Sequence, residues 1–167
     1  IMSEWRPDSE VSRINAQAGV APVAVSQETI QLLQKALALS RASSGAFDPS
    51  WAALRGIWDF KRKPPTLPTR TKLVEGLSRV GAQYVKIDPE KRTVFLTKSG
   101  MALGLGAIAK GYAIDRAAES LRKNGLKNFI VDGGGDLYLA GKKSSGQWTI
   151  GIRHPRTSAV LAELSIS

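Results

Sequence analysis

Four stretches of the chain carry apolar residues at the three- and four-residue spacing of an amphipathic helix. They are residues 9–17, 26–44, 70–80 and 108–124. The second is the clearest, because Ser26 stands where a helix is capped, Ile30 and Leu33 begin an apolar stripe, and Gly45 follows as a stop signal. In the third, the pattern predicts an inward-facing set made of Leu73, Val74, Leu77 and Val80.

From residue 84 the period of the pattern changes to two, as in a strand. Val85 and Ile87 alternate with polar residues, 89–92 is typical of a turn, and 93–97 returns as the second strand of a hairpin. Further strands are predicted at 101–105, 129–131, 137–140 and 148–153, and 159–167 has the pattern of a strand cut off before its end. The mixture predicts the α+β class, with helices packed on a largely antiparallel sheet.

Length and composition narrow the classes of protein that this chain can represent. Its 167 residues and 17.9 kDa fit a single domain, 1–167, which we interpret as truncated at both its N- and C-terminal ends. No apolar run approaches the roughly 18 residues that a membrane-spanning helix needs. The lack of cysteine excludes disulfides and thiolate metal sites, and the single His154 argues against a multi-histidine metal site or a Ser-His-Asp triad.

The formal net charge of +10 is concentrated between residues 55 and 98, most tightly at Lys61-Arg62-Lys63. Such a cluster could neutralise nucleic-acid phosphates, an anionic ligand or a membrane surface, or it could form a solvated loop that aids solubility. No helix-turn-helix, zinc-finger or RNP pattern accompanies it. We therefore favour the solvated loop and expect no nucleic-acid partner.

The segment 103–115 holds the most informative arrangement of candidate binding groups. A predicted strand runs through Gly104 and Gly106 into a helix with Lys110 in its first turn. Free N–H groups and the helix dipole favour a phosphate at such a helix start, and the lysine adds a positive charge. The third glycine of a dinucleotide fingerprint and a Walker A context are both missing. Close packing of helix on strand explains the small residues equally well, so both interpretations stay open.

Residues 110–115 resemble the K-G-Y-A-x-D element of the ApbE family, the FAD:protein FMN transferases. Other elements of that family are similar to stretches of this chain, in the same order. They are the S-x-[YW]-x-x-x-S…N segment at 2–15, G-A-F-D-P at 45–49, the l-W-g-F element at 57–60, the helix end, strand and G-G-D turn at 125–136, and the W-x-v-g-I-x-x-P strand at 148–155. The resemblance covers most of the chain and implies an ApbE-like, T-fold-related α+β fold that is incomplete here.

The resemblance also implies where FAD is contacted. Trp5 takes the position of an aromatic residue that packs on the flavin. Ala46, Phe47 and Asp48 match the loop that lines the FAD site, where Asp48 could accept a hydrogen bond from a ribose or ring N–H. Lys110 matches a polar residue that faces the ligand, and its charge suits the pyrophosphate.

Two positions concern the metal and a departure from the family pattern. Ala107 matches the residue whose backbone carbonyl ligates Mg²⁺ in the family, an oxygen ligand of the kind that magnesium prefers. Gly104 stands where the family commonly has Asp, so a ligand contact from that side chain is absent. The remaining metal ligands and the catalytic residues are expected downstream of Ser167.

The function that the resemblance implies is an Mg²⁺-dependent transfer of FMN from FAD to a Thr or Ser hydroxyl of an acceptor flavoprotein subunit, with release of AMP. This stretch alone is expected to be inactive. Periplasmic placement and a lipid anchor upstream are further expectations from the family. The alternatives are a non-catalytic protein that binds or stores FAD, which Gly104 favours, and a basic nucleic-acid-binding domain.

Overall fold

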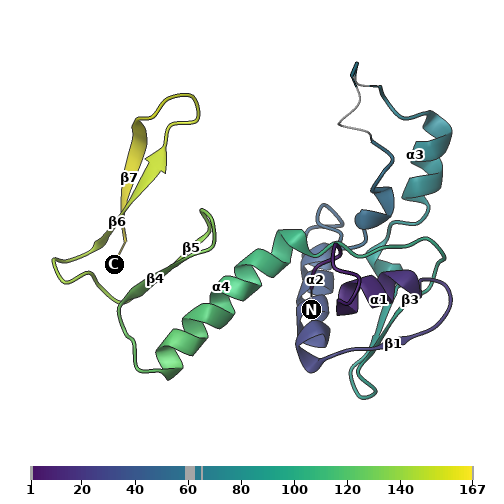
Figure 1. Ribbon diagram of the computed structural model, residues 1–167, viewed down its shortest axis with the longest axis horizontal. Helices are drawn as coiled ribbons and strands as arrows, with labels where there is room; N and C mark the ends of the chain where they lie inside the picture. The colour runs from purple at the N-terminus through teal and green to yellow at the C-terminus, as the bar shows by residue number, and fades with distance from the viewer. Residues whose placement is uncertain (1, 59–62, 65, 167) are drawn as a thin grey trace. The chain divides into compact units, whose positions relative to one another are not determined.

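The computed structural model describes residues 2–58, 63–64 and 66–166 (Figure 1). The chain divides into two compact units, Ile1–Ala109 and Lys110–Ser167, which we call unit 1 and unit 2. The helix α4 (Gly106–Lys123) begins at the end of unit 1 and continues into unit 2. None of the helices in the described part combines the length and hydropathy that a membrane crossing requires. The predicted single-domain organisation of 1–167 stays a prediction.

The helices of unit 1 begin at hydroxyl side chains that cap free backbone N–H groups. Ser9 caps α1 (Glu10–Ala16), Ser26 caps α2 (Gln27–Ala42) and Thr69 caps α3 (Arg70–Leu77). Two short 3₁₀ turns, η1 (Ala52–Leu54) and η2 (Ala82–Tyr84), lie on either side of α3 in the sequence. The predicted helices at 9–17, 26–44 and 70–80 are thereby confirmed.

The sheet of unit 1 has three antiparallel strands in the order β1-β3-β2, namely β1 (Val23–Ala24), β3 (Thr93–Leu96) and β2 (Val85–Asp88). Val85 pairs with Leu96 and Asp88 with Thr93, which is the hairpin predicted from the change of period. Helix α1 lies against β3 (Figure 1). The fully buried core of this unit includes Val11, Ile14, Ile30, Leu33, Val94, Leu96, Leu103 and Leu105.

Unit 2 continues from α4 into two hairpins. The first pairs β4 (Phe129–Asp132) with β5 (Leu137–Ala140), and the rings of Phe129 and Tyr138 stack with centroids 6.3 Å apart. The second pairs β6 (Trp148–Arg153) with β7 (Val160–Ile166). Within the described residues every pairing between named strands is antiparallel, so the predicted α+β class with a largely antiparallel sheet is confirmed. An isolated bridge between Trp51 and Ala102 is parallel.

The strand predicted at 101–105 is wrong. These residues make a single bridge, between Ala102 and Trp51, although Leu103 is fully buried. The Asn15 side chain takes the place of a neighbouring strand, because its amide donates to the Leu103 carbonyl (3.0 Å) and accepts from the Leu103 N–H (2.7 Å). A side chain can thus satisfy buried backbone that a ladder would otherwise pair.

The inward-facing set predicted for α3 is also wrong in part. Val74 and Leu77 are 59% and 56% exposed. The side of α3 that is buried carries Gly76, where an added Cβ would lie 2.2 Å from Ile57 Cδ1 and 3.0 Å from Leu54 Cδ2. The helix therefore packs by close approach of its backbone, and an apolar stripe in the sequence does not reveal that mode of packing.

Candidate functional site

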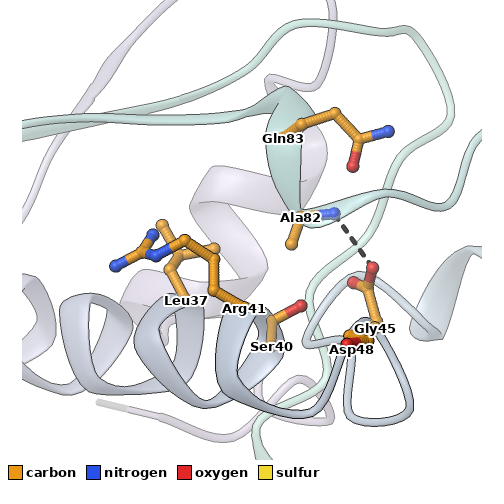
Figure 2. Close-up of a pocket in the computed structure, with 8 residues that line it drawn as sticks. Leu37, Ser40, Arg41, Gly45, Asp48, Ala82 and Gln83 are labelled. Carbon is orange, nitrogen blue, oxygen red and sulfur yellow. Dashed lines mark hydrogen bonds between the residues drawn. The ribbon is translucent and has the colours of Figure 1, made fainter.

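The loop that follows α2 is braced by the carboxylate of Asp48. Its Oδ1 accepts hydrogen bonds from the Ser50 N–H (2.8 Å) and from the Ser50 hydroxyl (2.6 Å). Its Oδ2 accepts from the Ala82 N–H at 2.9 Å, the bond drawn in Figure 2. Ser50 is fully buried, and its hydroxyl accepts from the Gly81 N–H (2.7 Å). Asp48 therefore joins this loop to the start of η2, while its contact with a ligand stays a prediction.

A hollow of about 390 Å³ lies beside this brace (Figure 2). It is lined by Leu37, Ser40, Arg41, Ser44, Gly45, Asp48, Ala82 and Gln83. The loop contributes Ser44 and Gly45 to the lining of this hollow. Both residues have a positive φ angle, 52° at Ser44 and 84° at Gly45. The positive φ at the second position explains the glycine there, since other residues rarely adopt it.

The other two predicted residues of this loop, Ala46 and Phe47, differ in their exposure to solvent. The Phe47 N–H donates to the Ser43 hydroxyl (3.0 Å), and the Ala46 N–H donates to the Ser43 carbonyl (3.0 Å). Phe47 is half-buried, whereas Ala46 is exposed. Both positions are thus fixed by the end of α2, and Ala46 is open to contact by a ligand.

The start of the predicted segment 103–115 is held to this loop by backbone and side-chain hydrogen bonds. The Gly104 N–H donates to the Pro49 carbonyl (2.9 Å), and the indole N–H of Trp51 donates to the Gly104 carbonyl (3.0 Å). Beyond this clamp α4 begins at Gly106, where an added Cβ would meet no atom within 4 Å. The structure therefore places Gly104 next to the loop that carries Ala46, Phe47 and Asp48, within unit 1.

Gly104 has no room for a side chain. A Cβ built there would lie 2.8 Å from both Cε2 and Nε1 of Trp51, closer than real Cβ contacts allow. The Asp that the family pattern commonly has at this position could not be accommodated unless Trp51 moved. The Trp51 ring thus occupies the space that an Asp side chain at position 104 would need.

Trp5 stands over a cation. The Arg55 guanidinium carbon lies 4.2 Å from the centre of the Trp5 ring and 5.4 Å from that of Trp51. Glu4, whose side chain is only 8% exposed, forms an ion pair with Arg55 (2.8 Å). Sequence reasoning missed Trp51 and Arg55, because nothing in their spacing indicates that they meet Trp5. The tryptophans at 51 and 58 are the only feature of the sequence near Arg55 that could have indicated an aromatic contact.

Ala107 lies in the first turn of α4 and is exposed. It offers a single backbone carbonyl, and the described residues contain no group of three His, Cys, Asp or Glu side chains that could hold a metal. The donor set in this part of the chain therefore does not fit Mg²⁺ by itself. The role of Ala107 as a ligand stays a prediction, and no chemical step is derived through a metal.

Lys110 belongs to unit 2, where it binds the glycine-rich turn between β4 and β5. Its ammonium donates to the Gly134 carbonyl (3.0 Å) and lies 3.3 Å from an Asp136 oxygen. The side chains of both partners of this ion pair are about half exposed. The Asp132 carboxylate accepts from the Gly135 N–H (2.8 Å) and holds the same turn. The structure thus gives Lys110 a partner inside unit 2, and its contact with pyrophosphate stays a prediction.

The basic cluster considered for nucleic-acid binding falls largely outside the described residues, since Lys61 and Arg62 belong to the gap 59–62. Asp59 and Phe60 of the resemblance at 57–60 lie in the same gap. The choice between a solvated loop and a nucleic-acid interface therefore stays a prediction.

Comparison with known proteins gives one consistent result. Residues 1–167 match the model of the ApbE family. The chain is 33% identical over 181 residues to the FAD:protein FMN transferase of Treponema pallidum, a match that covers 100% of this chain and 50% of that protein. It resembles the crystal structure of the ApbE protein from Thermotoga maritima with a TM-score of 0.86 at 32% identity, over 99% of this chain and 54% of that one. The flavin transferase ApbE from Vibrio cholerae gives a TM-score of 0.82 at 31% identity, over 92% and 50%. The chain spans about half the length of the curated relatives it matches.

Proposed function

Because this chain belongs to the ApbE family, we propose that the protein it forms part of is an FAD:protein FMN transferase. Its relatives carry that name, and the two matches cover 100% and 94% of this chain. The substrate is FAD, the acceptor is a flavoprotein subunit with a reactive Thr or Ser, and the reaction attaches FMN to that hydroxyl.

The reaction exchanges one phosphorus–oxygen bond for another. The acceptor oxygen forms a bond to the FMN phosphorus, the pyrophosphate bond to AMP breaks, and the hydroxyl proton passes to a base. FMN is left on the acceptor as a phosphoester, and AMP departs with the second phosphate. We assign the base to no described residue of this chain and place it downstream of residue 167.

The residues of this chain bind and orient the substrate. Trp5 packs on the flavin, and the loop that contains Ala46, Phe47 and Asp48 contacts FAD, as the family pattern implies. The N–H groups at the start of α4 favour the negative charge of the pyrophosphate. Lys110 adds a cation that can exchange its exposed partner, Asp136, for a phosphate oxygen.

The observation that carries this proposal is the joining of two distant segments. The loop at 45–51 and the segment at 102–106 are held together by the Pro49–Gly104 and Trp51–Gly104 hydrogen bonds (2.9 and 3.0 Å). These two segments contain most of the positions that the family pattern gives to FAD, and unit 1 holds them in a fixed geometry. Fixed geometry is what a transfer reaction needs from its binding residues.

The proposal also includes the metal on which the reaction depends and the location of the enzyme. The metal is Mg²⁺, to which this chain contributes the Ala107 carbonyl, with the other ligands downstream of residue 167. The enzyme acts in the periplasm, attached to the membrane by a lipid anchor upstream of this stretch. These points follow from the family pattern.

The test is a transfer assay with the whole protein. It is incubated with FAD and an acceptor subunit, with Mg²⁺ or with a chelator, and both covalent flavin on the denatured acceptor and free AMP are measured. We expect the two products to form in equal amounts and only with Mg²⁺, and the acceptor with its Thr or Ser replaced by Ala to stay unlabelled. Absence of both products under all conditions would contradict the proposal.

A second candidate, FAD binding without transfer, is favoured by Gly104, which leaves the site without the family's carboxylate. The same assay separates the two functions. Saturable binding of FAD to the whole protein without AMP or labelled acceptor would favour a storage function.

A further inference from the structure

We propose that Trp51 is an additional FAD-contacting side chain of this site and that Arg55 is its positioning residue. The inference rests on the proposed function, because it takes FAD as the ligand. It names a contact that the family resemblance did not provide, since the resemblance placed an aromatic contact at Trp5 only.

The first support is the position of Trp51. It directly follows the loop that contains Asp48, and its indole reaches the backbone of Gly104, so that it lies between the two segments of the candidate site. Its side chain is nevertheless 42% exposed. A large aromatic residue left open between two binding segments has a surface free to contact a planar ring.

The second support is that Trp51 excludes any side chain at position 104. The ring atoms 2.8 Å from a built Cβ leave no space for a carboxylate there. The indole N–H is already used by the Gly104 carbonyl. What this chain presents to the ligand here is therefore the apolar, π-rich part of an indole where the family pattern has a hydrogen-bonding acid. Van der Waals contact and stacking by the Trp51 ring thus replace the hydrogen bond that an Asp at position 104 would make to the ligand.

The third support is the way Arg55 holds the two indoles. Its guanidinium carbon lies 4.2 Å from the centre of one ring and 5.4 Å from that of the other, within the range of cation–π attraction. The buried Glu4 carboxylate holds the other side of the guanidinium at 2.8 Å. A planar cation fixed by an ion pair and two rings orients both indoles before the ligand arrives.

The experiment measures FAD binding to the whole protein by calorimetry, with the melting temperature of every variant recorded. Trp51→Leu keeps an apolar side chain but removes the ring, and we expect the dissociation constant for FAD to rise about tenfold. Trp51→Phe keeps a ring and should lose less. Arg55→Lys keeps the charge but not the planar stacking surface, and it should raise the dissociation constant several-fold while kcat at saturating FAD stays the same.

Trp148→Phe is the matched control. Like Trp51, Trp148 donates its indole N–H to backbone carbonyls, those of Ala140 (3.3 Å) and Gly141 (3.1 Å). It lies in unit 2 and has no place in the proposed site. Its substitution should leave the dissociation constant for FAD unchanged, which separates loss of an indole hydrogen bond from loss of a ligand contact.

A second measurement observes Trp51 in the wild-type protein itself. The whole wild-type protein is labelled with 5-fluorotryptophan, and the ¹⁹F resonance of Trp51 is assigned with Trp51→Phe. We expect that resonance to shift on addition of FAD. If the wild type binds FAD but the Trp51 resonance stays in place and Trp51→Leu binds equally well, the inference is wrong and the proposed function stands. If the wild type binds no FAD, both are wrong.

Discussion

The polar side chains of the 45–51 loop use their hydrogen bonds on neighbouring backbone. Both oxygens of Asp48 are occupied, and the buried Ser50 hydroxyl connects that carboxylate to Gly81. A side chain that accepts several hydrogen bonds fixes a loop more strongly than one that points into solvent. The rigidity of the candidate FAD loop therefore depends on Asp48 whether or not its carboxylate also touches the ligand.

Asp48→Asn tests this role. The amide keeps the size of the side chain but places an NH₂ group where one oxygen now accepts, so the free energy of unfolding should fall by about 1–3 kcal/mol. Ser50→Ala, which removes the hydroxyl from the same network, should destabilise the protein to a similar extent. Urea unfolding gives both values. Weaker FAD binding by Asp48→Asn with unchanged stability would instead indicate a direct ligand contact.

Substitutions of Lys110 and of Asp136 should have opposite effects on the affinity for FAD. If the ammonium serves the pyrophosphate, Lys110→Met should weaken FAD binding about tenfold, the effect of losing a charge-assisted hydrogen bond. Asp136→Asn removes the competing anion, so FAD affinity should stay the same or increase. The exposed pair contributes less than about 1 kcal/mol to stability, and melting temperatures should change little. Titration of each variant with FAD at two salt concentrations measures the effects, and equal losses in both variants would contradict the assignment.

The composition of the site could be predicted only in part from single residues. The family pattern led to Trp5, Asp48 and Gly104, because these lie in motifs whose order along the chain is informative. Trp51 and Arg55 could not be found in the same way, since their importance lies in a three-dimensional stack with Trp5. Such contacts depend on how η1 packs, which no local pattern encodes.

At the scale of elements, α1 and α2 are joined by the carboxylate of Glu10. It accepts from the N–H and the hydroxyl of Ser26 (2.8 Å each) and from the hydroxyl of Thr29. Burial opposes the ionisation of Glu10, but the hydrogen bonds from Thr29 and Ser26 outweigh it and hold the pKa of this carboxyl below its ordinary value. A negative charge at the start of α2 also suits the helix dipole.

This pairing makes stability depend on pH. Because the pKa of Glu10 is lower in the folded than in the unfolded chain, its contribution is complete above the unfolded pKa of about 4.3 and is lost as the pH falls through the folded value. Glu10→Gln should lower the free energy of unfolding by about 1–3 kcal/mol at neutral pH and by less in acid. Urea unfolding across the acid range measures the difference.

Glu119→Gln is the control for that series. The pKa of Glu119 is also lowered, by Lys123 and Arg116, but the group is exposed on α4. Its substitution should change stability little at any pH. An acid dependence of the same size in both variants would show that the network around Glu10 has no special part in it.

Helix and hairpin patterns predicted the elements of this chain where local signals agree with packing. Hydroxyl caps and glycine stops placed α2, and the alternation from residue 84 placed β2 and β3. The segment 101–105 carries the apolar pattern of a strand and is buried like one, yet its backbone is satisfied by Asn15. The buried side of α3 could not be predicted from the sequence either, because Gly76, through which the helix packs, contributes no apolar side chain to a periodic pattern.

At the scale of the whole molecule, this chain spans about half the length of its relatives. We therefore expect the whole protein and residues 1–167 alone to respond differently to FAD and Mg²⁺. In the whole protein, FAD at a hundred times its dissociation constant should raise the free energy of unfolding by about 2.7 kcal/mol. Residues 1–167 alone should show no stabilisation by Mg²⁺ and no FMN transfer, since their described part lacks a group of metal-binding side chains. Thermal melts and the transfer assay test both statements. Sustained transfer by residues 1–167 alone would refute this division of the site.

The hydrogen bonds between Asn15 and Leu103 join residues that are 88 positions apart in the chain. On the ribosome, α1 emerges long before its partner segment, so Asn15 has no backbone to pair with until most of unit 1 has been synthesised. The entropy of closing so long a loop must be overcome before Gly104 and the start of α4 can settle beside the 45–51 loop. We therefore expect the candidate FAD site to be the last part of unit 1 to form during synthesis.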